Sequence, residues 1–423
     1  MDRPLRFCMI TTFYPPENFG GDGYHVHHLS NELAGRGHKV DVIHCTDAFR
    51  LLAHRRLFPH VAHHPNVTVH KLRSPWGFLS PLATHQTGYP FLKGAEIRRI
   101  LDKKFDVIHY HNISLVGGPK VLEMGSGIKL YSVHEYWLLC PTHVLFKFNR
   151  APCTQRQCFA CSLICRRPPQ MWRYSRLLES ALKHVDAFLS PSGFGRTVHH
   201  QMGLDLPMRH MPYFLPPGAT SIEEPWRTRE PAARYFLFVG RLEKIKGLHT
   251  IIPVFLFPGR APLWVAGKGN FERRLVRMAD GSPNIRFLDY QSGVQLQSLV
   301  RNAVAVIVPS VCYDLSPLVI LEAFRERTPV IVRNIGGMPE MVRESGGGFI
   351  FSTEQELTAA MDCLLADRDL RDTLGNRGFQ AYLRNWTPDV YVRRYLELIH
   401  ELGKGGGREQ PDRETAARNP CTL

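Results

Sequence analysis

Short apolar runs alternate with amphipathic stretches along the first half of the chain. Residues 5–12 and 39–45 have the length and the β-forming side chains of strands. Between them, a glycine-rich loop at 18–23 precedes apolar side chains that recur at helical spacing over residues 26–33. The pattern predicts a strand–helix–strand unit. Its glycine loop lies at the carboxyl end of the first strand, where open parallel sheets bind ligands.

The same alternation continues along the rest of the chain. Further strands are expected at residues 67–72, 105–110, 129–133 and 187–190, with a helix at about 172–184. Prolines and a change of composition between Tyr213 and Ala233 predict a domain boundary. After it, strands are expected at residues 235–239, 263–266, 285–288, 304–308, 330–332 and 348–351, separated by helical patterns such as 271–279, 296–302 and 317–324.

This organisation predicts an α/β protein with two Rossmann-like, doubly wound domains that face a central cleft. The expected N-terminal domain covers residues 1–217 and includes a cysteine-rich loop at 140–165, and the expected C-terminal domain covers residues 231–383. An amphipathic helix at 384–402 is expected to pack back on the first domain. Residues 403–423, rich in glycine and charge, are expected to be a disordered tail.

The 423 residues include 53 basic and 38 acidic side chains, which gives a formal charge of +15. This excess favours anionic partners such as nucleotide phosphates, nucleic acid or an acidic membrane surface, although a solvated basic surface explains it equally well. No segment approaches the ~18–20 apolar residues of a membrane-spanning helix, and the start lacks the long apolar core of a secretory signal. A cytoplasmic protein is expected, with peripheral contact at the inner face of the membrane left open.

The segment 240–247 follows an expected strand and carries Arg241 and Lys246. A planar guanidinium fork and a mobile ammonium group are suited to a diphosphate. The alternative is a charged solvent loop, because surface lysines and arginines are common.

The segment 309–323 also follows an expected strand and opens a helix. Ser316 is expected to be the N-cap and Pro317 the first helical residue. The backbone N–H groups of Leu318 and Val319 would then face the cleft, where a helix start binds phosphate oxygens.

Two acids belong to this segment. Glu322 is expected about one turn inside the helix. If it faces the same ligand, its carboxylate can accept hydrogen bonds from ribose hydroxyls, and Asp314, in the loop, could hold hydroxyls of a transferred sugar. The alternative for Glu322 is an ordinary acid on a helix surface.

These segments, taken in order, resemble the large family of retaining GT-B glycosyltransferases of the group 1, family-4 type. That family contains bacterial mannosyltransferases and sucrose and glycogen synthases. The resemblance covers nearly the whole chain, and the matching segments are residues 14–16, 20–21, 37–40, 106–109, 134–135, 190–192, 240–247, 267–269, 310–323, 328–330 and 336–340. It implies the GT-B architecture and transfer of a sugar, with retention, from a nucleotide-sugar to a saccharide, lipid-linked or small-molecule acceptor, as in glycan or glycoconjugate biosynthesis.

The resemblance also implies roles for individual residues. His134 would contact the donor sugar and stabilise the transition state, and Arg241 and Lys246 would hold the diphosphate. Asp314 stands where the family has the first of two glutamates, so the carboxylate is kept on a shorter stem, and Glu135 stands where aspartate is more common. The implied catalytic residues are His134, Asp314, Arg241 and Lys246, and the implied donor-binding residues are Gly20, Gly21, Arg241, Lys246, Asp314, Leu315, Ser316, Leu318, Val319 and Glu322.

Five cysteines lie between residues 140 and 165 and include one C-x-x-C pair. Thiolates at such spacing bind zinc, and the candidate ligands are Cys140, Cys153, Cys158 and Cys161. The alternative is free cysteines that pack as small hydrophobic residues. No cofactor is expected to be needed for catalysis.

Residues 146–176 mix aromatic and basic side chains. With the resemblance in mind, an anionic membrane surface or a lipid-linked acceptor is favoured over nucleic acid, for which the sequence has no recognition motif; a solvated loop is the alternative. Two other functions stay open on the same fold. One is a nucleotide-sugar epimerase or phosphorylase, and the other a catalytically decayed protein that only binds a nucleotide-sugar.

Overall fold

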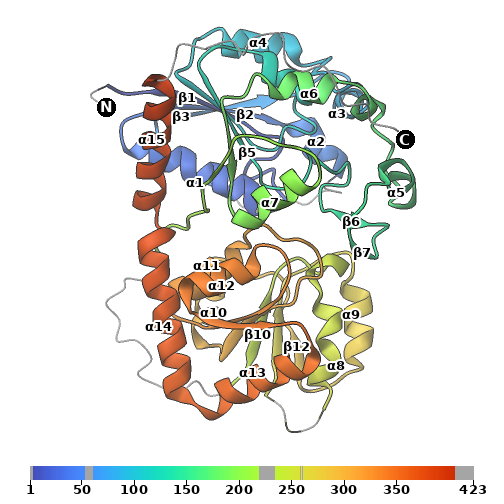
Figure 1. Ribbon diagram of the computed structural model, residues 1–423, viewed down its shortest axis with the longest axis vertical. Helices are drawn as coiled ribbons and strands as arrows, with labels where there is room; N and C mark the ends of the chain where they lie inside the picture. The colour runs from blue at the N-terminus through green and yellow to red at the C-terminus, as the bar shows by residue number, and fades with distance from the viewer. Residues whose placement is uncertain (1–2, 53–60, 219–233, 258, 260, 405–423) are drawn as a thin grey trace.

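The chain folds into two α/β lobes stacked along the long axis of the molecule (Figure 1). The structure, a computed structural model, describes residues 3–52, 61–218, 234–257, 259 and 261–404. The prediction of two Rossmann-like domains is confirmed. The expected boundary region between Tyr213 and Ala233 falls largely at residues 219–233, which lie outside the described part.

The N-terminal lobe is built on a seven-stranded sheet with the order β3-β2-β1-β4-β5-β8-β9, and all of its neighbours pair in parallel. Its inner strands are almost completely buried because helices cover both faces. The strands are β1 (Arg6–Ile10), β2 (Lys39–Cys45), β3 (Val67–Leu72), β4 (Val107–Tyr110), β5 (Ile128–Ser132), β8 (Ala187–Ser190) and β9 (Met208–His210).

The helices of this lobe include α1 (Gly21–Gly35), α2 (Thr46–Leu52), α3 (Leu79–Thr87), α4 (Gly94–Leu101), α6 (Leu177–Leu182) and α7 (Gly193–Gln201). The short elements η1 (Pro119–Glu123), β6 (Phe146–Lys147), β7 (Ala151–Pro152), α5 (Cys158–Ile164) and η2 (Met171–Tyr174) lie between the strands.

The prediction of a single helix at about 172–184 is wrong. This segment is divided into η2 and α6 at Ser175. The hydroxyl of Ser175 donates to the carbonyl of Trp172 at 2.7 Å and accepts from the N–H of Leu177 at 3.2 Å. These local side-chain bonds replace the helical pattern, as serine hydroxyls commonly do.

The C-terminal lobe is built on a six-stranded parallel sheet with the order β12-β11-β10-β13-β14-β15. Its strands are β10 (Phe236–Val239), β11 (Leu263–Ala266), β12 (Ile285–Phe287), β13 (Ala305–Val308), β14 (Val330–Arg333) and β15 (Gly348–Phe351). Around it lie η3 (Lys244–Lys246), η4 (Leu248–Thr250), α8 (Ile252–Phe255), α9 (Glu272–Ala279), α10 (Gly293–Asn302), α11 (Leu318–Arg325), α12 (Met338–Ser345) and α13 (Glu354–Ala366).

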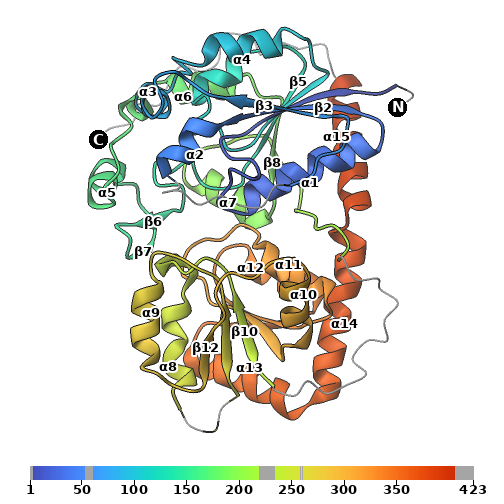
Figure 2. The ribbon, with the colours of Figure 1, turned by 180° about the vertical axis from the view of Figure 1, so that it is seen from behind.

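Two long helices at the C-terminal end join the lobes. α14 (Arg368–Asn385) packs on α11 and α12, and α15 (Pro388–Lys404) returns to the N-terminal lobe, where it contacts α1 and β5. Figures 1 and 2 show the pair running along one side of both lobes. Tyr391, Tyr395 and Leu398 of α15 are buried in the same core cluster as Phe7 and Leu29. Because α15 extends to Lys404, two residues of the expected tail are helical, and residues 405–423 lie outside the described part.

In the described part of the chain, no helix combines the length and the apolar character needed to cross a bilayer.

A buried hydrogen bond links α15 to the first sheet. The hydroxyl of Tyr395 lies 2.9 Å from Nδ1 of His109, whose Nε2 lies 2.8 Å from the Ser132 hydroxyl. Tyr395→Phe leaves a buried imidazole nitrogen without its partner, so we expect the free energy of unfolding to fall by about 1–3 kcal/mol. Urea unfolding measures it. Tyr391→Phe is the control, because that hydroxyl has no hydrogen bond within the described residues; equal losses in both variants would contradict the prediction.

Buried neutral histidines make the fold sensitive to acid. Burial lowers the pKa of His44 to about 3, and burial also lowers the pKa of His199 to about 4. The unfolded chain takes up these protons near pH 6.5 and the folded chain does not, so stability falls as the pH drops below 6.5. Each such histidine contributes a loss of about 2 kcal/mol at pH 5. Urea unfolding at pH 7 and pH 5 tests this: His44→Gln should show a smaller acid loss than the wild type, and His210→Gln, at an exposed site, should not.

Candidate active site

The carboxyl ends of the two sheets approach each other where the lobes meet. A Cβ atom placed on Gly21, at the start of α1, would lie 2.9 Å from the Leu318 side chain at the start of α11. The rings of Phe194 and Tyr313 lie 5.1 Å apart across this interface, and Leu315 is part of the N-terminal core cluster. Segments that follow β1 and β8 therefore face the segment that follows β13, the usual position of a ligand in open α/β sheets.

The loop after β10 is held against the loop after β13 by Gly247. Its φ of +73° lies in the left-handed region, and a Cβ atom there would overlap the carbonyl oxygen of Pro309. The N–H of Val311 donates to the carbonyl of Ile245 at 2.9 Å. Only glycine allows this approach, and it brings Lys246 next to the second loop.

Lys246 and Asp314 form an ion pair, with Nζ at 2.8 and 2.9 Å from the two carboxylate oxygens. Burial lowers the pKa of Lys246, but the charges of Asp314 and Cys312 and the hydrogen bond to Asp314 together raise it above its usual value, so the ammonium group stays protonated. Arg241 pairs with Glu243 at 2.7 Å and is 52% exposed. Both expected phosphate ligands thus lie at the interface, each beside a carboxylate.

The start of α11 differs from the sequence prediction. Pro317, not Ser316, is the N-cap, and no side chain caps the helix. The hydroxyl of Ser316 is buried and lies 3.6 Å from the sulfur of Met341, so tertiary packing has turned it away from the helix start. The N–H groups of Leu318 and Val319 are left without a side-chain cap, which keeps this positive helix end open to an anion.

Glu322 lies one turn further into α11 and is half-buried. Burial raises its pKa, and the charge of Arg325 lowers it. Among the described residues, no side chain pairs with its carboxylate, so it is available to hydroxyl donors.

His134 follows β5 on the N-terminal side of the interface. Its Nε2 lies 2.8 Å from Nδ1 of His111, and its Nδ1 lies 2.6 Å from the hydroxyl of Tyr213. Burial lowers its pKa to about 3, so the ring is neutral. The neighbouring Glu135 binds Nδ1 of His143 at 2.7 Å.

Asp22 is an interface residue that the sequence analysis did not select. Burial and the charge of Glu135 raise its pKa, whereas the N–H of Gly23, the charge of Arg241 and a hydrogen bond from Asn112 lower it. The carboxylate of Asp22 therefore interacts electrostatically with Arg241 of the opposite lobe. Its place directly after Gly20 and Gly21 is the signal that could have identified it.

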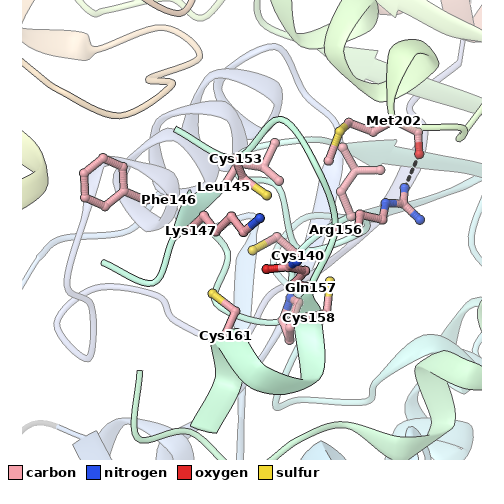
Figure 3. Close-up of a pocket in the computed structure, with 12 residues that line it drawn as sticks. Cys140, Leu145, Phe146, Lys147, Cys153, Arg156, Gln157, Cys158, Cys161 and Met202 are labelled. Atoms are coloured by element: carbon pink, nitrogen blue, oxygen red, sulfur yellow. Dashed lines mark hydrogen bonds between the residues drawn. The ribbon is translucent and has the colours of Figure 1, made fainter. Parts of the chain in front are cut away.

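The four candidate zinc ligands Cys140, Cys153, Cys158 and Cys161 line one small cavity of about 10 Å³ (Figure 3). The N–H of Phe148 also donates to the sulfur of Cys161 at 3.2 Å. Nevertheless, the described residues contain no group of three or more His, Cys, Asp or Glu side chains arranged to hold a metal ion. Zinc therefore stays a prediction, which metal analysis of the purified protein would decide.

The aromatic and basic stretch at 146–176 is divided between core and surface. Phe146 and Trp172 are buried, and the guanidinium of Arg173 lies 4.7 Å from the ring of Trp172. Phe159 and Tyr174 are exposed. Only part of this stretch is therefore available to a membrane or an acceptor.

Two family models match consecutive parts of the chain. Residues 19–212 match "Glycosyltransferase Family 4", and residues 222–381 match "Glycosyl transferases group 1". Together they cover both lobes and the interface loops described above.

Individual proteins agree with these matches. An uncharacterized glycosyltransferase of Methanocaldococcus jannaschii is 24% identical over 418 residues, covering 93% of this chain and 97% of the relative. Among solved structures, sucrose-phosphate synthase from Thermosynechococcus elongatus aligns with a TM-score of 0.72 at 18% identity, covering 95% of this chain and 100% of the other. Anabaena HepE, solved with UDP and glucose, aligns with a TM-score of 0.65 at 17% identity over 94% of this chain and 100% of the other.

The order of the loops, the two family matches and the two-lobed fold agree along the chain. The protein belongs to the group 1, family-4 type of glycosyltransferases and is a transferase with the GT-B architecture.

Proposed function

We propose that the protein transfers a sugar from a nucleoside diphosphate sugar to an acceptor hydroxyl with retention of the anomeric configuration. The observation that carries the proposal is the meeting of Lys246, Asp314 and the uncapped start of α11 at one edge of the C-terminal sheet. Cations and open N–H groups bind a diphosphate. Anabaena HepE, which shares the fold, was solved with UDP and glucose.

Binding of the donor would exchange partners at these cations. The carboxylates of Asp314 and Glu243 neutralise Lys246 and Arg241. The diphosphate would take over both cations, which frees Asp314 to accept hydrogen bonds from hydroxyls of the transferred sugar. Glu322, whose carboxylate has no partner among the described residues, would bind the ribose.

The chemical step would take place on one face of the sugar. The bond between the anomeric carbon and the leaving phosphate oxygen breaks, and the acceptor oxygen bonds to the same face of that carbon. The acceptor proton passes to the departing diphosphate, whose negative charge is stabilised by Arg241, Lys246 and the helix start. Burial lowers the pKa of His134 to about 3, so its ring is neutral. Both ring nitrogens are hydrogen-bonded, to His111 and to Tyr213, so the ring would bind a hydroxyl of the donor sugar by exchanging one of these two partners.

The decisive experiment follows the configuration of the product. The purified protein is incubated with each of a panel of nucleotide-sugars that raise its melting temperature, together with a candidate acceptor, and the product is examined by NMR. We expect the anomeric configuration of the donor in the product. An inverted product would contradict the retaining mechanism, and an isomerised donor without transfer would indicate an epimerase instead.

Removal of the donor contacts should abolish transfer. We expect Lys246→Ala and Glu322→Ala each to lower kcat/KM by at least about 100-fold, because each removes a charged hydrogen bond to the donor. Lys120→Ala is the control, since it removes a lysine that is paired with Glu123 at 2.7 Å within η1 and has no role in the proposed donor site. Circular dichroism checks the fold, and near-normal activity in the two site variants would refute the assignment.

A further inference from the structure

A second candidate site lies in the N-terminal lobe, beyond the carboxyl ends of β2 and β3. It is a cavity of about 720 Å³ between α2 and the segment that follows β3. Its volume is in the range of pockets that hold small-molecule ligands, about 300–1,000 Å³. None of the residues proposed for the donor site lines this cavity.

Hydrogen bonds from side chains of α2 to the backbone around the end of β3 join the two walls of this cavity. The Asp47 carboxylate of α2 accepts from the N–H of Ser74 at 2.7 Å, and the Thr46 hydroxyl donates to the carbonyl of Leu72 at 3.0 Å. These bonds fix the start of α2 beside the end of β3. As a consequence Arg50, in the last turn of α2, and Arg73, directly after β3, line the same cavity.

The cavity is cationic. Within the described part of the chain, neither Arg50 nor Arg73 forms a hydrogen bond or ion pair through its guanidinium group, and the Asp47 carboxylate is engaged by Ser74. Two guanidinium groups without a protein partner at one cavity are suited to a phosphate or carboxylate, which accepts their paired N–H donors.

The rim of the cavity is apolar. Leu51 and Phe78 line it and are 40% and 59% exposed, and the neighbouring Trp76 is 62% exposed. In both Figure 1 and Figure 2, α2 and α3 lie on the same side of the N-terminal lobe. Large apolar side chains gathered around a charged pocket are typical of a surface that binds an apolar partner.

The cavity is structurally connected to the donor site. Phe49 of α2 packs on Phe19 with 4.8 Å between ring centroids. Phe19 is followed by Gly20 and Gly21, and a Cβ atom on Gly21 would lie 2.9 Å from Leu318 at the start of α11. A ligand in the cavity therefore lies on the lobe that faces the donor-binding loops.

We propose that this cavity binds the anionic group of an amphipathic acceptor, with Arg50 and Arg73 on the phosphate or carboxylate and Leu51, Phe78 and Trp76 against its hydrocarbon part. The inference rests on the proposed transfer function and names the class of acceptor. The proposed acceptor is one presented by a membrane, because the exposed apolar side chains of the rim would be buried by a hydrocarbon chain and not by a hydrated anion.

Vesicle flotation of the full chain tests the proposal. The vesicles contain phosphatidylcholine with or without phosphatidic acid, and the proteins are the wild type, Arg50→Gln/Arg73→Gln and Arg98→Gln/Arg99→Gln. The last variant is the matched control, since it removes two exposed charges from α4 of the same lobe. We expect wild-type binding only to the anionic vesicles, a loss of about 10- to 30-fold in Arg50→Gln/Arg73→Gln, and a change of less than about threefold in the control. Phe78→Ser should also weaken binding, and Phe257→Ser, at an exposed site on the other lobe, should not.

Two other measurements separate the possible failures. Thermal shifts with inorganic phosphate show whether the cavity binds a free anion. If phosphate raises the melting temperature of the wild type but not that of Arg50→Gln/Arg73→Gln, and the wild type does not bind vesicles, the proposal of an amphipathic acceptor is overturned. Equal vesicle binding by both double variants would overturn the site itself. Thermal shifts with a panel of nucleoside diphosphates report the donor site independently. If none of them stabilises the wild type, the proposed function fails, whereas the vesicle result still decides the cavity.

Discussion

The structure depends on one constraint: the carboxyl ends of two parallel sheets must face each other across the interface between the lobes. All strands of a parallel sheet end at the same edge, so every loop that leaves this edge reaches the interface. α15 maintains the arrangement, because α14 packs on the C-terminal lobe while α15 is buried in the N-terminal core. Together with direct contacts across the interface, such as that of Phe194 with Tyr313, this return of the chain fixes Arg241 and Lys246 relative to His134 and Asp22.

Charge compensation is a consequence of that constraint. The interface collects cations on the C-terminal side, and a charge removed from water is unfavourable unless it is paired. Lys246, which is largely buried, is accordingly neutralised by Asp314 of its own lobe, and the more exposed Arg241 is paired with Glu243. A diphosphate that displaces these carboxylates replaces one ion pair by another, so donor binding does not have to desolvate an isolated charge. The aspartate at position 314, shorter by one methylene than the glutamate of the family pattern, already reaches Lys246 at 2.8 Å.

Much of the fold could be predicted because buried parallel strands leave a local signature. Residues 39–45, 187–190 and 348–351 were predicted with the bounds of β2, β8 and β15. The first alternates polar and apolar side chains, and the other two are short, mainly apolar runs. The break at Ser175 was missed because the apolar spacing continues through it, and a single hydroxyl determines the outcome. The N-cap at α11 was missed because contact with Met341, far along the chain, orients Ser316.

The same distinction applies to the candidate site. Residues such as Arg241, Lys246 and Glu322 could be selected because their position after a strand or in a helix start is local information. Those partners of the candidate site residues that are distant in the sequence could not be predicted. The contact of His134 with Tyr213 spans 79 positions, and the electrostatic contact of Asp22 with Arg241 joins different lobes. Cysteine spacing likewise selected four residues that share a cavity, but spacing alone does not determine how the sulfur atoms point.

The chemistry proposed for the donor explains why the N-terminal lobe needs strong contacts away from the reacting atoms. If the departing diphosphate accepts the acceptor proton, no protein base fixes the position of the attacking hydroxyl, and a small misplacement is costly in rate. Contacts to distant parts of the acceptor can supply that orientation, since binding energy from non-reacting groups contributes to the chemical step. A charged cavity such as the one lined by Arg50 and Arg73 would provide such contacts. Its connection through Phe49 and Phe19 to the glycine loop would fix the acceptor relative to the anomeric carbon. On this view donor and acceptor are each oriented by an anionic group, one at the carboxyl edge of each sheet.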